Sequence, residues 1–344
     1  INLLSRKKKK KYLSIYIYLM EILETINGMK KSQEYLLDLI DNDENIEENS
    51  ENLLSFIKNN KINEDKFDLK NFLYLLSNII NNHQRSLNFF QKIESILLFL
   101  KDEIKANFSN IDIFHIFRKC KRILLFLIEE KFIVIDESLV SKMSNEKYVK
   151  MNYQEYFFPE ISNYMTKDQI KSIYEKNTDI FGIIKSNEEG KEIKEKIDED
   201  NNNNESKIAD DNNNDFDIYI KDMDEFKKRR QIGENCDYLC YLIREDLIEE
   251  FLIYVNRNDC DLKSPMKTSI YETNIFLIKE NSVYLFEYAA FFGSTQILKY
   301  FYKNNCNLTP KIWLYAIHSE NPEMIDFLVQ NRIKPNSNTY LDCL

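Results

Sequence analysis

Glycine and proline are scarce in this chain of 344 residues, which contains five of each. Proteins use about 7% glycine and about 5% proline on average. Dinucleotide-binding folds need glycine in their phosphate loops, and β-proteins with many turns need both residues. The shortage of both residues therefore argues against these two classes of fold.

Long apolar runs and closely spaced cysteines are also lacking. No apolar run reaches the roughly 20 residues that span a bilayer, so we expect no membrane segment and a soluble protein. The six cysteines are scattered, and the closest pair is Cys236 and Cys240. Disulfide scaffolds and zinc sites need denser spacing, so we expect core packing of this pair, reduced thiols and a cytoplasmic location.

An excess of positive charge is also lacking, because 57 acidic residues outnumber 47 basic ones and the formal net charge is −10. Nucleic-acid binding needs Lys and Arg on one face, and the one dense basic run is 6–11, so no nucleic-acid partner is expected. This run precedes an apolar stretch, as in a signal peptide, but Glu21 and Glu24 interrupt that stretch. We interpret residues 1–28 as a non-native or disordered extension, with Met29 as the better start.

Apolar residues recur every three and four positions, which is the period of one helix face and predicts an all-α chain. Residues 29–186 are expected to form a helical domain, with the very apolar runs 87–104 and 111–130 as its core helices. Residues 187–217 are dominated by Glu, Lys, Asp and Asn. They hold too few apolar side chains to offset the entropy of ordering, which predicts an acidic, Asn-rich disordered linker and a domain boundary.

The clearest repeated unit runs from 284 to 293 and continues in a second apolar stretch at 297–301. Ala289 and Ala290 are small, which lets two antiparallel helices and a neighbouring repeat approach closely. Gly293 follows them and can supply the positive φ that ends the first helix. The unit therefore predicts a helix, a tight turn and a second helix.

A second copy begins at Trp313, and its Ala316 stands 27 positions after Ala289. Glu320 replaces the glycine of the first copy. This spacing is shorter than the usual repeat of about 33 residues. The connection between the two copies is therefore expected to be shortened.

A weaker copy covers 239–254, with Asp246 in the place of the glycine. The segment 262–282 is then an inserted connection between this copy and the next. A new turn begins shortly before Leu344, so the array is expected to be truncated. Arrays of this type need about three stacked repeats for stability.

Several stretches resemble a large ankyrin-repeat family that is expanded in trichomonad protists and carries an amino-terminal domain of unknown function. They are YLLDLIDNDENIEEN, NNHQRS, IGENCDYLCYLIREDLIEEF, EYAAFFGS and LYAIHSENPE. The resemblance covers the chain from about residue 31 onward. It implies a helical amino-terminal domain followed by a short, degenerate ankyrin α-solenoid at 218–344, with no established activity or partner.

This reading predicts a protein-protein interaction or scaffold protein that binds another protein. Stacked repeats place equivalent positions in a row. The predicted partner-binding residues are Arg244, Glu245, Phe291, Phe292, His318 and Ser319. Phe291 and Phe292 are expected to be exposed anchors of this row, and their packing against the inserted segment 271–278 is the alternative.

An enzyme or regulatory subunit with its site in the amino-terminal domain is the rival class. His83, His115 and His318 are far apart and form no His-Glu-x-x-His motif. The stretch 182–191 fails the spacing of a phosphate loop, and the acidic residues at 41–48 fail that of a calcium loop. We therefore predict no catalytic residues, no metal and no cofactor.

Overall fold

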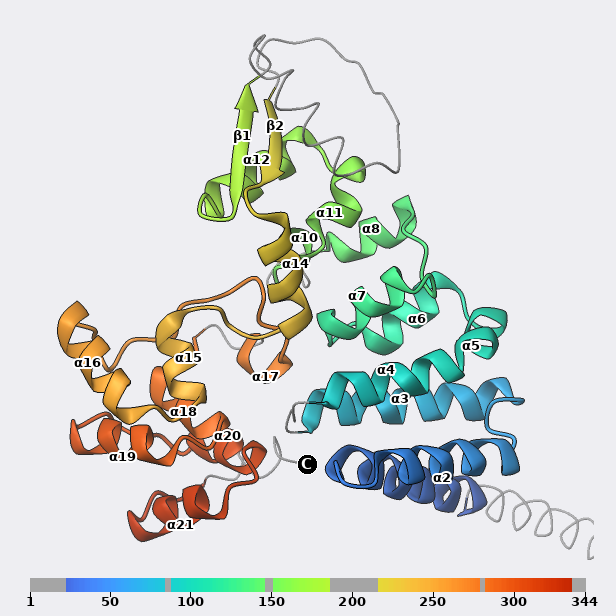
Figure 1. Cartoon of the computed structure of the whole chain (residues 1–344), viewed down its shortest axis with the longest axis horizontal. Coiled ribbons are helices and arrows are strands. Elements are labelled where there is room, and N and C mark those ends of the chain that lie inside the picture. Colours follow the sequence, from blue (N-terminus) through green and yellow to red (C-terminus); the bar gives the residue numbers. More distant parts are fainter. Residues whose placement is uncertain (1–22, 84–87, 146–150, 186–215, 279–281, 336–344) are drawn as a thin grey trace, which may run out of the picture. The chain divides into compact units, whose positions relative to one another are not determined.

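The computed structural model describes residues 23–83, 88–145, 151–185, 216–278 and 282–335 (Figure 1). The described residues fall into two compact units. One unit holds those up to 134, those at 237–267 and those from 273 onward, and the other holds those at 135–236 and 268–272. Regular structure in the described residues is helical except for one two-stranded sheet. The predicted all-α character is therefore confirmed.

The amino-terminal part of the first unit is a set of seven helices within the described residues. They are a helix over 23–41, α2 (Ile46–Asn59), α3 (Lys66–Asn82), α4 (Phe89–Phe99), α5 (Lys101–Asn107), α6 (Asn110–Phe117) and α7 (Lys121–Glu129). The sequence places residues 23–28 in the extension, but they are helical and belong to the helix described over 23–41. Residues 1–22 lie outside the described part of the chain.

The two core helices expected at 87–104 and 111–130 are each divided in two. Leu100 separates α4 from α5 with φ −94° and ψ 10°, and the chain leaves the helix between α6 and α7 as far as Cys120. Apolar side chains along α4 and α5 are buried: Phe89, Ile93, Ile96, Leu97, Leu100 and Ile104. Leu98 of α4 is exposed. Dividing each helix allows both halves to bury apolar side chains in different directions.

Polar side chains fix the ends of these helices. Ser109 accepts a hydrogen bond from the backbone amide of Asp112 at the start of α6, and the Asp112 side chain accepts one from the amide of Ser109. This capping box satisfies amides that have no partner within the helix. Ser109 therefore caps the start of α6.

The second unit contains α8 and the elements on both sides of the predicted linker. They are α8 (Glu137–Met143), α10 (Tyr153–Tyr156), α11 (Phe158–Ile161), η1 (Ser162–Tyr164), α12 (Lys167–Lys176), β1 (Phe181–Lys185), β2 (Phe216–Ile220) and α14 (Met223–Ile232). Strands β1 and β2 pair antiparallel, with Phe181 opposite Ile220 and Gly182 opposite Tyr219. The Tyr219 ring lies so close over Gly182 that a Cβ there would stand 2.5 Å from it.

This strand pairing corrects the expected linker boundary. Phe216 and Asp217, which the sequence places in the linker, belong to β2, and the described chain before and after the linker lies in the same unit. The two compact units therefore do not divide at 187–217. Residues 186–215 lie outside the described residues.

A buried arginine joins α14 to α10 and α11 within this unit. Arg230 Nη1 donates to both carboxylate oxygens of Glu160 at 2.9 and 2.8 Å and to the Tyr156 carbonyl at 3.1 Å. The guanidinium also lies 4.9 Å from the centre of the Phe226 ring. A charge removed from water in this way needs its partner, because an unpaired buried charge is strongly destabilising.

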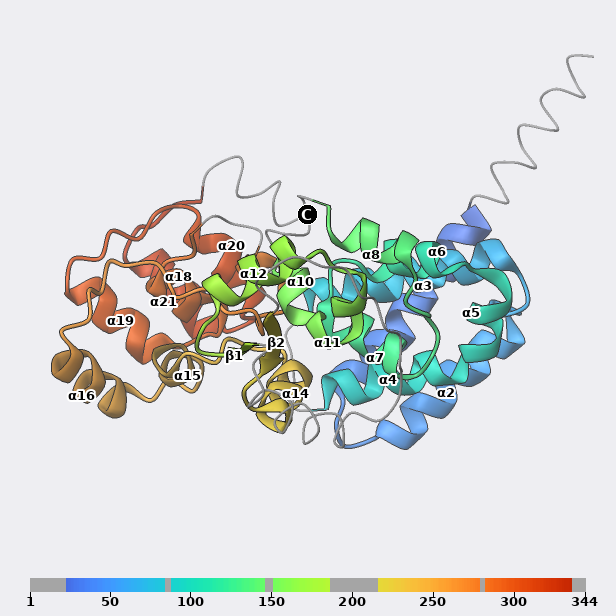
Figure 2. The same ribbon diagram turned by 90° about the horizontal axis from the view of Figure 1, so that it is seen from above.

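In the described residues, the carboxy-terminal part of the first unit contains three helix pairs and one short helix. The first helices of the pairs are α15 (Tyr238–Arg244), α18 (Leu285–Phe291) and α20 (Ile312–His318), and the second are α16 (Ile248–Asn258), α19 (Thr295–Lys303) and α21 (Pro322–Gln330). Helix α17 (Ile275–Ile278) lies in the connection between the first two pairs. Helix α18 contacts both α15 and α20, and both ribbon views show these helices side by side (Figure 1, Figure 2). One shared hydrophobic core spans all three pairs.

No helix in the described parts of the chain is both long enough and apolar enough to cross a membrane.

The buried pair of Arg230 and Glu160 gives a direct test of the second unit. Replacing Glu160 with Ala should lower the free energy of unfolding by about 3–5 kcal/mol, because Arg230 then remains buried without its carboxylate. The control is Glu225→Ala, which removes the partnered carboxylate of the neighbouring, more exposed Arg229. That change should cost about 0–1 kcal/mol. Urea unfolding measures both, and equal effects of the two variants would contradict the assignment.

Candidate functional site

Each of the three helix pairs turns on a residue with left-handed backbone. The φ angles are 48° at Asp246, 73° at Gly293 and 51° at Glu320. In the first two turns the amide that follows this residue donates to the carbonyl five positions earlier: Leu247 to Leu242 at 3.0 Å, and Ser294 to Ala289 at 2.9 Å. The three turns share one backbone conformation, although only one of them contains glycine.

Hydrogen bonds connect each turn to the next, and we call this set the turn ladder. The Asp246 carboxylate accepts from the amides of Gln296 at 3.1 Å and Ile297 at 3.0 Å, at the start of α19. Ser294 Oγ donates to the carbonyl of Ile243. The ladder continues with Asn321 Nδ2, which donates to the Gly293 carbonyl at 2.9 Å. The ladder therefore fixes the positions of the three pairs relative to one another.

Small residues lie where the first helices of the pairs meet. Ala289, Ala290 and Ala316 are fully buried in the shared core. Trp313 is also buried, and its Nε1 donates to the Ile333 carbonyl at 2.8 Å. These residues, together with Gly293, have packing and turn roles that suit their predicted structural part in the repeats.

Four of the six predicted partner-binding residues form a continuous row of contacts. The Arg244 guanidinium lies 5.9 Å from the centre of the Phe292 ring. The Phe292 and Phe291 ring centres are 5.0 Å apart, and the Phe291 ring stacks on His318 at 4.2 Å with an interplanar angle of 28°. Arg244 Nη1 also donates to the Tyr288 hydroxyl at 2.9 Å. We call Arg244, Phe292, Phe291 and His318 the stacked row.

The exposure of the predicted residues differs from the expectation. Phe291 is only 5% exposed and Ser319 only 2%, whereas Glu245 is exposed and Phe292 is half-buried. Phe291 is buried because Phe292 and His318 enclose its ring. Ser319 turns inward, and its Oγ donates to the Ala316 carbonyl at 2.7 Å. Phe291 is therefore not the exposed anchor that the sequence predicted.

Phe276 of α17 is the residue of this site that the sequence prediction missed. Its ring meets His318 edge-on, with ring centres 5.1 Å apart and an interplanar angle of 70°. The next residue, Leu277, is buried in the shared core. The sequence feature that could have indicated this short helix is Asn274, a capping residue type directly before a short apolar run. Its side chain accepts a hydrogen bond from the Phe276 amide at 3.0 Å. The inserted segment thus contacts His318 at one end of the row, whereas the packing alternative expects it against Phe291 and Phe292.

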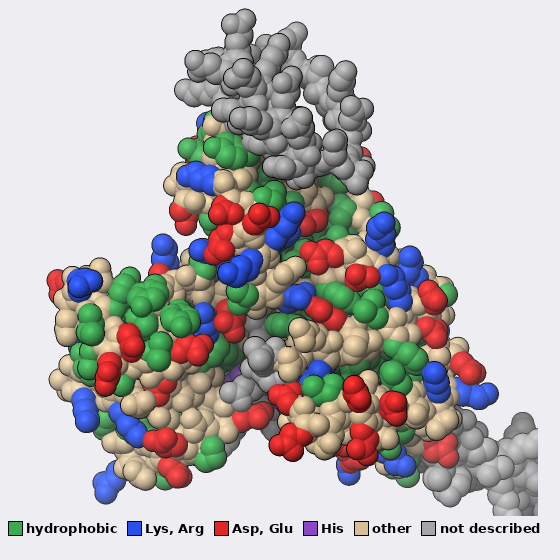
Figure 3. Space-filling model, viewed as in Figure 1, with side chains coloured by type: hydrophobic (Ala, Val, Ile, Leu, Met, Phe, Trp, Pro, Cys, Tyr) green, Lys and Arg blue, Asp and Glu red, His purple; other side chains and the backbone are tan. Residues whose placement is uncertain are grey.

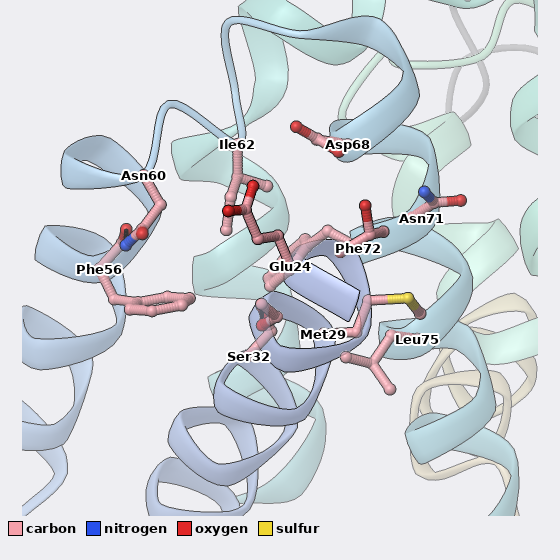
Figure 4. A pocket seen from close by; sticks show the side chains of 12 residues that line it. Glu24, Met29, Ser32, Phe56, Asn60, Ile62, Asp68, Asn71, Phe72 and Leu75 are labelled. Atoms are coloured by element: carbon pink, nitrogen blue, oxygen red, sulfur yellow. Dashed lines mark hydrogen bonds between the residues drawn. The ribbon is translucent and has the colours of Figure 1, made fainter. Parts of the chain in front are cut away.

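A cavity of about 460 Å³ lies among the helix at 23–41, α2 and α3 (Figure 4). Its residues are Glu24, Thr25, Gly28, Met29, Ser32, Phe56, Asn60, Ile62, Asp68, Asn71, Phe72 and Leu75. Glu24 and Asp68 supply its carboxylates. Burial raises the pKa of Asp68, and the nearby charge of Asp65 raises it further. The cavity combines apolar walls with acidic groups, which suits a small cationic ligand.

The two closest cysteines have different environments. Cys240 is buried in the shared core, as predicted, but Cys236 is exposed, with its Sγ 3.6 Å from the Ser269 hydroxyl. Asp237 caps the start of α15, so Cys236 lies before the helix and Cys240 lies within it. Among the described residues, no group of three His, Cys, Asp or Glu side chains is placed to hold a metal ion.

Comparisons of the chain with protein-family models, with curated proteins and with solved structures find no match.

The turn ladder predicts different effects of glycine on stability at two left-handed positions. Glu320→Gly relieves backbone strain of about 1–2 kcal/mol, partly offset by about 0.4–1 kcal/mol from the more flexible unfolded chain. Stability should stay equal or rise. Asp246→Gly also relieves strain, but it removes the acceptor for two α19 amides, a capping loss of about 1–2 kcal/mol.

Thermal and urea unfolding of these two variants should therefore differ in sign or clearly in size, with Asp246→Gly the less stable. If Asp246→Gly were as stable as Glu320→Gly, the hydrogen bonds from α19 to Asp246 would contribute nothing to stability. That result would contradict the role of Asp246 in the turn ladder.

Proposed function

We propose that the three helix pairs are degenerate ankyrin-type repeats forming a short solenoid, and that the chain is a non-catalytic interaction or scaffold protein. The observation that carries the proposal is the repeated left-handed turn at Asp246, Gly293 and Glu320. Repeats of this kind stack by short-range contacts and expose one row of equivalent side chains to a partner. The stacking of α18 between α15 and α20 supports this arrangement.

The irregular spacing of the turns is compatible with repeats. Gly293 lies 47 positions after Asp246, and Glu320 lies 27 positions after Gly293. The longer interval contains α17 and a connection closed at its base, where the Met266 amide donates to the Val283 carbonyl at 2.7 Å. An insertion held at its base lengthens one connection without changing how the helix pairs stack.

The binding surface that we propose is the accessible part of the stacked row and its surroundings. Arg244, Phe292 and His318 are partly exposed, and Glu245 is exposed. Phe291 is buried between Phe292 and His318, so in this proposal it holds these two side chains in place and does not contact the partner. An aromatic ring flanked by charged groups is typical of the residues that dominate interface energy. The net charge of −10 favours another protein over nucleic acid as the partner.

This proposal separates the effects of the two neighbouring phenylalanines. Phe292→Ala should weaken partner binding about tenfold or more, on the usual scale for a dominant interface residue, while the fold persists. Phe291→Ala should instead lower the free energy of unfolding by about 3–5 kcal/mol, because it leaves a cavity in the core. The partner is identified by affinity capture from native cells with mass spectrometry, and the variants are then compared by its recovery and by urea unfolding.

The matched control is Tyr302→Ala, which removes an exposed aromatic ring of α19 outside the row. Its capture of the partner should match that of the unmodified chain. Full recovery of the partner by a folded Phe292→Ala variant would rule out the stacked row as the binding surface.

A small-molecule site in the amino-terminal helices is the second candidate, and the cavity that contains Glu24 and Asp68 favours it. Carboxylates beside apolar walls would select cations that carry an apolar group. Cationic amphiphiles should raise the melting temperature of the chain, and Asp68→Asn should reduce that rise. Equal effects of cationic and anionic compounds would exclude this cavity as their site.

A further inference from the structure

The first helix pair exposes a face that the second and third pairs bury. Counting back five positions from each left-handed turn gives three tyrosines. Tyr241 is 43% exposed, whereas Tyr288 and Tyr315 are fully buried. Counting back eight positions gives the same result, because Tyr238 is 52% exposed and its equivalents Leu285 and Ile312 are buried. Two independent positions of the repeat therefore identify one uncovered face.

The buried equivalents show what such a face contacts. In the second pair, Arg244 of α15 donates to the Tyr288 hydroxyl at 2.9 Å. In the third pair, the ring of Phe291 from α18 lies 6.4 Å from the Tyr315 ring at a steep angle. Each tyrosine is thus covered by the first helix of the preceding pair. The covering helix contributes a guanidinium in one case and an aromatic ring in the other.

The exposed face of the first pair is a cluster of aromatic side chains. The Tyr238 ring centre lies 5.2 Å from that of Tyr254 on α16 and 6.0 Å from that of Tyr241. Ile253, also on α16, is 62% exposed. Figure 3 shows hydrophobic side chains gathered over the part of the molecule formed by α15 and α16. We call Tyr238, Tyr241, Ile253 and Tyr254 the tyrosine face.

Carboxylates accompany this face. Asp237 caps α15 directly before Tyr238, and the exposed Glu249 and Glu250 lie on α16, beside Ile253 and Tyr254 in the sequence of that helix. Burial raises the pKa of Tyr254, and the charge of Asp237 raises it further, which agrees with a carboxylate close to the ring. A partner that covers the aromatic rings would meet negative charge around them.

We propose that the tyrosine face binds a basic amphipathic helix of a partner protein, which stacks on α15 as α15 itself stacks on α18. An arginine of that helix would donate to the Tyr241 hydroxyl, in the way that Arg244 donates to Tyr288. Arginine suits this position because its guanidinium both hydrogen-bonds and lies over aromatic rings. The proposal concerns a different surface from the stacked row and does not depend on it.

Two synthetic helical peptides test this assignment. Both have about 18 residues, enough to form helix on a surface, and the same Leu/Ala stripe, but one carries Arg and the other Glu on its polar positions. Fluorescence anisotropy of the labelled peptides with the full chain should show binding of the Arg peptide. The Glu peptide should bind at least about tenfold more weakly, since it meets the carboxylates beside the face.

The double variant Tyr238→Ser/Tyr241→Ser should weaken binding of the Arg peptide by about tenfold or more. Circular dichroism should report an unchanged helix content, because both side chains are exposed. Tyr302→Ser, at an exposed tyrosine of α19, and Phe292→Ala, in the stacked row, should leave this binding unchanged. Absence of Arg-peptide binding, equal binding of the Glu peptide, or undiminished binding by the folded double variant would each overturn the proposal.

Discussion

The arrangement of the helix pairs depends on the carboxylate of Asp246. This residue adopts a left-handed backbone conformation, which costs roughly 1–2 kcal/mol for a residue other than glycine. Its carboxylate accepts from the amides of Gln296 and Ile297, which have no partner within the first turn of α19. Hydrogen bonds from amides to a charged acceptor are among the stronger ones, and the helix dipole adds to them. The backbone strain at Asp246 is therefore offset by the hydrogen bonds with which its carboxylate caps α19 of the next pair.

The same coupling determines which side chains meet at the surface. Because α19 starts at a fixed place relative to Asp246, Ala289 and Ala290 lie in the interior and the rings of Phe291 and Phe292 follow them. Arg244, the last residue of α15, then lies against both Phe292 and Tyr288. The stacked row and the covered tyrosines are two consequences of one stacking geometry. The tyrosine face is the same surface at the first pair, where Tyr238 and Tyr241 are exposed.

The sequence allows the turns to be predicted better than the contacts. The small-small-glycine pattern at 289–293 identifies a turn because few residues besides glycine accept a left-handed backbone easily. Alignment with it then locates Asp246 and Glu320. The sequence cannot show that Phe291 is buried, because the rings that enclose it come from His318, 27 positions later, and from its own neighbour. The exposure of a side chain depends on which distant segments pack against it. Helix α17, which lies in the inserted connection, packs against His318 of the stacked row.

Long-range pairing explains the other differences from the sequence prediction. Strands β1 and β2 are five residues each and lie on opposite sides of a long polar stretch, so neither has a recognisable partner nearby. Arg230 pairs with Glu160 across 70 positions, and no local pattern indicates that contact. The helical period, by contrast, is local, and α2 and α3 lie within the helical domain that it predicts.

Native-state hydrogen exchange measures the central claim most directly, which is that the turn ladder makes the three pairs one cooperative unit. The relevant amides are those of Leu247, Ser294 and Ile333, each of which donates to a carbonyl five positions earlier. As denaturant is raised toward the unfolding transition, their opening free energies should converge on one common value. Separate values that persist for each pair, with α15 and α16 opening independently of α18 and α19, would contradict the account.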